Sequence, residues 1–225
     1  MEPESPIVEK LRGIHDRGIL AVNEGRIKPF VVPEAAFTQF ILVNAFSSPT
    51  KHLSKLLGTL EMLENPLCLQ FTLADRDFLL HSTIKQCNLP AGVDADAMEV
   101  SSLLAAFASI NDHEVVFDTV VLNDGNVLLA ASEVPTVVSA CRLELDKLIR
   151  ARGLEPTPID ILHMTLARLI TLPGKSLGFA LDTYRDTVLE LRAMVAEEPI
   201  RLKLGNYWHG QVHRLVTTPP VMAYP

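Results

Sequence analysis

The chain has 225 residues, of which 48% are hydrophobic and 21% charged, so it can bury a substantial core. No stretch approaches the roughly 18 uninterrupted apolar residues of a membrane-spanning helix, and we expect no membrane partner. The net charge of −7, with no basic run, argues against a long nucleic acid as partner, because binding a polyanion requires neutralised phosphates. A small ligand that carries phosphate fits this composition better.

The three cysteines, Cys68, Cys87 and Cys141, are far apart and form no Cys-x-x-Cys pair. An odd number at such spacing argues against a disulfide framework and against a cysteine-built zinc site. The first residues are acidic and lack the basic and apolar regions of a secretory signal. We therefore expect a cytoplasmic protein.

Helical and β patterns alternate from the start of the chain. Residues 7–27 carry apolar positions interrupted by two glycines, which predicts a broken helix. A buried-strand pattern at 37–43 precedes Ser48 and Pro49, which are typical of a helix start. That helix has leucines at helical spacing, namely Leu53, Leu56, Leu60 and Leu63.

Turn signals divide the middle of the chain into paired β runs. Residues 74–77 separate runs at 67–73 and 78–84, which predicts a hairpin. Asn123-Asp124-Gly125-Asn126 is a strong turn signal between two further runs. The other predicted elements are a helix at 100–107, strands at 115–122, 127–131 and 161–166, helices at 138–148 and 177–195, and β segments between 200 and 216.

This order of elements falls into two rough halves, each with one strand that contains a His-x-Thr sequence. Hairpin signals favour antiparallel pairing, so the sequence predicts an α+β fold rather than a doubly wound one. The glycine-rich phosphate loops Gly-x-Gly-x-x-Gly and Gly-x4-Gly-Lys are both absent from the sequence.

The His-x-Thr sequences share a longer pattern: Leu-Leu-His-Ser-Thr-Ile around His81 and Ile-Leu-His-Met-Thr-Leu around His163. Side chains alternate between the two faces of a strand, so His81 shares a face with Thr83 and His163 with Thr165. The His52-Leu53-Ser54 sequence has the same spacing but lies in a helical pattern, where such residues do not share a face. Two half-buried structural histidines are the alternative interpretation.

The paired motifs resemble those of the two-histidine (2H) phosphoesterase superfamily, which includes RNA 2′,3′-cyclic phosphodiesterases and 2′-5′ RNA ligases. His163-Met164-Thr165-Leu166-Ala167-Arg168 is similar to the His-x-Thr-Leu-x-Arg motif of that group. The first motif departs from the pattern, because Ser82 and Lys85-Gln86-Cys87 stand where relatives have apolar residues and glycine. The likeness in element order covers roughly residues 36 to 216.

The resemblance implies a bilobal fold over residues 36–225, with two pseudo-symmetric antiparallel-sheet lobes, flanking helices and a central cleft. Residues 1–35 would be an N-terminal helical extension. It also implies a hydrolase that needs no metal and no cofactor. Two histidines can supply both the acid and the base for opening a cyclic phosphate, because imidazole titrates near neutrality.

We therefore expect His81 and His163 to be the catalytic pair, although the sequence does not assign the acid and the base. Thr83 and Thr165 can donate hydrogen bonds to the non-bridging phosphate oxygens. The resemblance also implies that Arg168 binds phosphate. Simple alternation would put Arg168 on the far face of its strand, so this role requires the strand to end or to bulge.

Two further residues are candidates for binding substrate. Lys85 shares a face with His81 by alternation and could be a second cation, or a solvated surface lysine. Tyr207 or Trp208 could stack on a base, or pack in the core. The His-x3-His spacing of His209 and His213 lacks an evident third ligand, and we expect no metal site there.

The leading hypothesis is a cyclic phosphodiesterase that hydrolyses a 2′,3′-cyclic phosphate or a related cyclic or 2′-5′ nucleotide. Its substrate would be a small nucleotide or an RNA end, which indicates RNA processing. A catalytically silent nucleotide- or RNA-binding module on the same fold is the first alternative. A protein that binds partners through residues 1–35 is the second. The sequence leaves the physiological substrate, ligation and the oligomeric state open.

Overall fold

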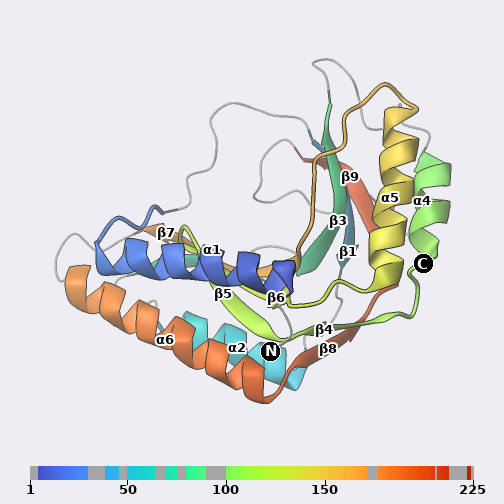
Figure 1. Ribbon diagram of the computed structural model, residues 1–225. Helices are drawn as coiled ribbons and strands as arrows, with labels where there is room; N and C mark the ends of the chain where they lie inside the picture. The colour runs from blue at the N-terminus through green and yellow to red at the C-terminus, as the bar shows by residue number, and fades with distance from the viewer. Residues whose placement is uncertain are drawn as a thin grey trace.

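The computed structural model describes residues 5–29, 39–45, 50–63, 69–74, 80–89, 100–171, 177–205, 207–212 and 222–223 (Figure 1). The helices among them are α1 (Pro6–Asn23), α2 (Lys51–Glu61), α4 (Val100–Ala108), α5 (Thr136–Arg150) and α6 (Leu177–Glu197). The strands are β1 (Gln39–Ala45), β2 (Gln70–Leu73), β3 (His81–Asn88), β4 (Glu114–Phe117), β5 (Thr119–Asn123), β6 (Asn126–Ala131), β7 (Leu162–Thr171), β8 (Ile200–Lys203), β9 (Tyr207–Val212) and β10 (Met222–Ala223).

One large sheet has the order β10-β9-β1-β3-β7-β6-β5, and β4 and β8 form a small separate sheet. The strand pairings are antiparallel, so the predicted α+β class is confirmed. The long strand β7 is central: β6 pairs along one edge, while β3 and then β2 pair along the other.

The hairpin predicted across residues 74–77 is wrong. Among the described residues, β2 and β3 pair with β7 and not with each other. The turn signal is local, whereas both strands pair with β7, which is distant in sequence, and bury apolar residues in the main core. The second turn signal is confirmed, because β5 and β6 form a hairpin in which Asp124 (φ 46°) and Gly125 (φ 85°) both have positive φ.

Two predicted boundaries also move. The run at 115–122 is divided at Asp118, whose carboxylate accepts a hydrogen bond from the backbone N–H of Ser132 at 2.9 Å. The helix predicted to start at Ser48 and Pro49, which lie outside the described residues, begins at Lys51 in α2. Thr50 caps this helix, since its Oγ1 accepts from the backbone N–H of Leu53 at 3.2 Å.

The large sheet has two different faces. The main hydrophobic core lies on one of them, which we call the core face, beneath α2, α4, α5 and α6. A smaller cluster lies on the opposite face, where α1 covers β5 and β6. Its buried members are Leu11, Val121, Leu128 and Ala130. Figure 1 shows α1 and α6 on opposite sides of β5 and β6.

Helix α1 is continuous, whereas the sequence predicted a broken one. Gly18 is the reason for the close fit: a Cβ there would lie 2.3 Å from the carbonyl oxygen of Leu122 on β5. One turn earlier, His15 is buried and its Nδ1 accepts a hydrogen bond from the backbone N–H of Leu122 at 3.3 Å. The helix propensity lost at a glycine is therefore offset by packing against the sheet.

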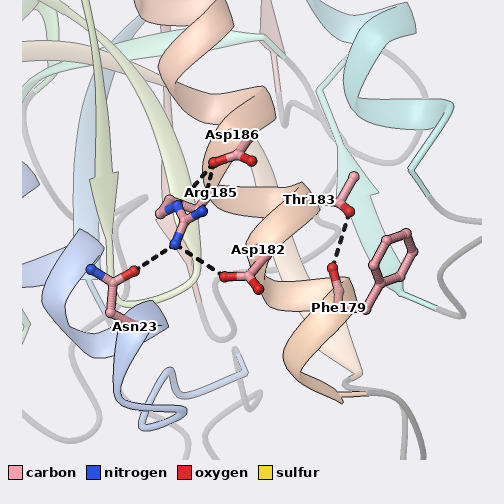
Figure 2. Close-up of polar contacts among 6 residues, drawn as sticks. All are labelled: Asn23, Phe179, Asp182, Thr183, Arg185 and Asp186. Carbon is pink, nitrogen blue, oxygen red and sulfur yellow. Dashed lines mark hydrogen bonds and ion pairs between the residues drawn. The ribbon is translucent and has the colours of Figure 1, made fainter.

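The end of α1 is also tied to α6 (Figure 2). Arg185 on α6 donates hydrogen bonds of 3.0 Å to the side-chain oxygens of Asn23 and Asp182. It also pairs with Asp186 at 2.8 Å. Within the part of the chain that the structure describes, no helix has the length and apolar character needed to cross a bilayer.

Candidate active site

The two motif strands meet at a single residue pair. Ser82 of β3 pairs with Met164 of β7, and the Ser82 hydroxyl donates a 2.9 Å hydrogen bond to the carbonyl of His163. Continuing this antiparallel register by one residue in each direction sets His81 beside Thr165 and Thr83 beside His163. The fold therefore brings together the two motifs, which are far apart in sequence.

The four motif side chains lie on the same side of the sheet, which we call the histidine face. His81, Thr83, His163 and Thr165 are each partly buried, while the residues between them are buried. The intervening Met164 belongs to the main core on the opposite face. This alternation is the one predicted from the sequence; the catalytic roles of the four residues stay predictions.

A β-bulge in β7 returns Arg168 to the histidine face. On the paired strand β6, Leu128 faces Thr165 and the next residue, Val127, faces Ala167, so Leu166 is the extra residue. Leu166 and Ala167 both lie in the main core, which inverts the alternation that follows. The bulge on which the Arg168 prediction depended is present.

A matching bulge in β3 sends Lys85 to the other side. Val43 of β1 faces Thr83 and Leu42 faces Lys85, so Ile84 is the extra residue. Lys85 is only 2% exposed and forms an ion pair with Asp146 of α5. The prediction that Lys85 shares a face with His81 is wrong, because simple alternation ends at the bulge.

Gln86 takes the position that alternation had assigned to Lys85. It follows Thr83 by three residues, as Arg168 follows Thr165, and each interval contains the extra residue of a bulge. Gln86 is partly buried, and its neighbour Cys87 belongs to the main core. The sequence interpretation missed Gln86, since only the bulge places it on the histidine face.

Burial and nearby positive charge lower the pKa of His163 in the second motif. Burial is the largest cause that lowers the pKa of His163 from 6.5 to about 4. The charges of His81, Arg142 and Arg168 lower it further, in that order. Burial lowers the pKa of Arg168 to about 10, which leaves its guanidinium charged at neutral pH. His163 is thus a neutral imidazole beside fixed positive charge.

Arg142 of α5 is the second residue that the sequence interpretation missed. It is 6% exposed, and its Nε donates to the carbonyl of Ile84 at 3.0 Å. One of its terminal nitrogens, Nη2, donates to the carbonyl of Ile161, also at 3.0 Å. The only signal in the sequence was an arginine next to the apolar stripe of a predicted helix, which usually indicates a surface residue.

Helix α1 flanks the second motif. On β6, Ala130 pairs with His163 and Leu128 pairs with Thr165, and both are buried against Leu11 of α1. The partly buried residues that pack on this cluster are Ile7, Ile14 and Ile161. Lys10 of α1 also forms an ion pair with Asp160, which immediately precedes Ile161. The histidine face is therefore flanked on its β6 side by the apolar side of α1.

The remaining candidates lie on β9. The backbone of Tyr207 pairs with Asn44, and that of Trp208 pairs with Val43, the partner of Thr83. The side chains of Tyr207 and Trp208 are outside the described part of the structure, and so is His213. Among the described residues, no group of three or more histidine, cysteine or acidic side chains could hold a metal ion.

Comparison with known proteins finds similarity to solved structures. No family model matches the sequence, and no curated protein matches it. The crystal structure of the MHV ns2 PDE domain is similar at a TM-score of 0.46 and 12% sequence identity. The match covers 82% of this chain and 99% of that domain. At these values, the similarity carries no argument about family or activity.

Proposed function

We propose that this protein is a phosphodiesterase that opens 2′,3′-cyclic phosphates, or related cyclic and 2′-5′ nucleotides, with His81 and His163 as its acid–base pair. One observation supports this most strongly: the two His-x-Thr motifs, 82 residues apart in sequence, meet at Ser82–Met164 with all four polar side chains on one face. The resemblance of both motifs to those of 2H phosphoesterases supports it further.

The lowered pKa of His163 supports assigning it as the base. At neutral pH its imidazole can accept a proton from water while the water oxygen bonds to phosphorus. His81, in its protonated form, gives a proton to the departing 3′ oxygen as the bond from phosphorus to that oxygen breaks. The product is a 2′-phosphate with a free 3′-hydroxyl, and solvent then restores both imidazoles.

The groups around the histidines suit a phosphate. Thr83 and Thr165 can donate to its non-bridging oxygens, and Arg168 adds a positive charge on the same face. Developing negative charge is stabilised most where water is largely excluded, as it is beside the partly buried His163. Because the imidazoles carry out both proton transfers, the proposal requires neither a metal nor a cofactor.

The substrate that we propose is a small nucleotide or the end of an RNA. The net charge of −7 and the one buried arginine that the described residues place on the histidine face, Arg168, favour recognition of one phosphate group. The wall formed by α1 on the β6 side supports the same choice, since it limits how far a polymer could extend in that direction.

The test is hydrolysis of 2′,3′-cyclic mononucleotides in the presence of a chelator, comparing the wild type with His81→Ala and His163→Ala. We expect turnover to the 2′-phosphate, and a loss of roughly 10²–10⁴-fold in each variant, as for a general acid or base. A normal rate in His81→Ala would overturn the assignment. Nucleotide binding without turnover by the wild type would favour the silent binding module instead.

A further inference from the structure

The pairing between β3 and the segment that leads into β7 is interrupted between two contacts. At one end, the backbone N–H of Thr157 donates to the carbonyl of Gln86 at 2.9 Å. At the other end, Ser82 pairs with Met164. Between these two contacts, β3 advances by four residues, from Ser82 to Gln86. The facing segment advances by seven, from Thr157 to Met164, so it is three residues longer. Two residues border this interval: Ile84, which the β1–β3 register skips, and Ile161, which lies one residue before β7.

Arg142 spans this interval. Its guanidinium comes from α5 on the core face, and two of its nitrogens bond the Ile84 and Ile161 carbonyls, each at 3.0 Å. Ile84 is the bulge residue after the first motif, and Ile161 lies two residues before His163. One planar group therefore bonds both β3 and the residue that precedes β7, in the interval between the Ser82–Met164 and Gln86–Thr157 contacts.

We propose that Arg142 is a positioning residue: it sets the separation of the two motif strands, and thereby that of His81 and His163. Its charge also contributes to the lowered pKa of His163, after burial and the charge of His81. This inference rests on the proposed function. A rigid planar fork suits the task, because a flexible lysine could reach one carbonyl but could not hold two at a fixed spacing.

The charged groups around these residues are consistent with that role. His163 faces His81, Arg142 and Arg168, all of which oppose its protonation. Arg142 itself faces Asp160, Cys141 and Asp146. Both carboxylates are already engaged, Asp160 with Lys10 of α1 and Asp146 with Lys85 of β3. The guanidinium therefore keeps its charge within reach of His163 although it is buried, with a pKa lowered to about 10.

The experiment compares Arg142→Gln and Arg142→Lys with the wild type by two measurements. The first is an NMR titration of the His163 imidazole, which needs no substrate. The second is the pH dependence of kcat and KM. Arg152→Gln is the matched control, since Arg152 is also partly buried but bonds Leu148 and Ser102 away from the motifs.

In Arg142→Gln we expect the pKa of His163 to rise above about 4 while it stays below 6.5, because burial, the largest cause of the lowered pKa, remains. We expect kcat to fall by roughly 10–10²-fold through misalignment, with a smaller change in KM. In Arg142→Lys the pKa should stay near 4 while kcat still falls, because charge is kept and the double bridge is lost. Arg152→Gln should match the wild type in both measurements.

A folded Arg142→Gln with unchanged pKa and unchanged kcat would overturn the inference. If that variant does not fold, wild-type kcat in Arg142→Lys would overturn it equally. A wild type without turnover would remove the proposed function alone, and the titration would still report whether Arg142 controls His163.

Discussion

Strands β3 and β7 share the same order of motif residues and bulge, but they differ in the side chains that follow the bulge. Each carries histidine, a core residue, threonine and then a bulge. After the bulge, β7 directs Ala167 into the core and Arg168 to the histidine face. β3 directs Lys85 to the helix side, where it pairs with Asp146, and Gln86 to the histidine face. A one-residue shift in the position of the basic residue thus decides which face of the sheet it reaches.

The flanks of the two strands differ as well. β7 lies beside Leu128 and Ala130, which α1 covers. β3 lies beside β1, where Val43 pairs with Thr83. Among the described residues, neither of these strands contributes to the apolar cluster beneath α1. The strand that carries Arg168 is therefore also the one beside the apolar side of α1. Burial and positive charge act together to lower the pKa of His163.

The largest expected effect distinguishes the structural role of Lys85 from the proposed substrate-binding role of Arg168. Lys85→Ala leaves the carboxylate of Asp146 largely buried without its partner, and should cost about 3–5 kcal/mol in the free energy of unfolding. At a temperature where the variant is folded, kcat and KM should match the wild type. Urea unfolding and steady-state kinetics check both. Lys147→Ala, on the same helix as Asp146, is the control. Its ion pair with Glu144 is exposed, so its loss should change the free energy of unfolding little.

Weaker substrate binding by Lys85→Ala at full stability would contradict this comparison. It would return Lys85 to the histidine face.

Acid should weaken the flank that α1 covers. Burial is the main cause that lowers the pKa of His15 from 6.5 to about 4. Between these pH values, His15 is therefore protonated in the unfolded chain but neutral in the folded protein. The stability of the wild type should fall as the pH drops from about 6.5 to 4, by up to about 3 kcal/mol from this residue. Urea unfolding at pH 7 and pH 4.5 measures that loss.

His15→Asn should remove that part of the loss, because the amide oxygen can still accept from the N–H of Leu122 and does not titrate. His113→Asn, at an exposed histidine, is the control and should leave the acid loss unchanged. An acid loss in His15→Asn equal to that of the wild type would show that His15 is not its source.

Arg168 and Gln86, which lie on the histidine face after the two bulges, should contribute differently to kcat/KM. Arg168→Ala removes a charged donor and should lower kcat/KM by roughly 10–10²-fold. Gln86→Ala removes a neutral amide and should lower it by roughly 2–10-fold. Gln70→Ala, on the exposed end of β2, should have no effect. Equal losses at Arg168 and Gln86 would mean that the site is symmetric after all.

The pH profile gives the finest distinction between the histidines. If His163 is the base, the acid limb of kcat/KM should lie near pH 4, well below the ordinary value for histidine. Measuring kcat/KM for a cyclic mononucleotide from pH 3.5 to 8 checks this. An acid limb near pH 6.5 would assign the base to a less perturbed group.

The smallest expected effect concerns the contact between the strands. Ser82→Ala removes the hydrogen bond to the His163 carbonyl and should cost about 1 kcal/mol in the free energy of unfolding. Because the Ser82–Met164 backbone pair remains, kcat should change by less than about threefold. Urea unfolding together with single-point kinetics is sufficient. A large loss of kcat would show that the pairing of the motif strands depends on this hydroxyl more than on Arg142.

Much of the local structure was accessible from the sequence. Period-two alternation correctly set His81 with Thr83 and His163 with Thr165, and the Asp124-Gly125 turn correctly predicted the β5–β6 hairpin. The turn signal at 74–77 failed, because pairing with β7 outweighs a local turn. The glycines in α1 suggested a break, since nothing local reveals that β5 approaches Gly18 so closely.

The sequence by itself determined the α+β class, the two motif strands and the face on which each histidine and threonine lies, since these follow from short-range periodicity. Only the tertiary structure decided where Lys85, Gln86 and Arg168 point, because a bulge arises from pairing between strands far apart in the chain. It also decided the place of Arg142, whose two acceptors belong to segments that meet only when the sheet has formed.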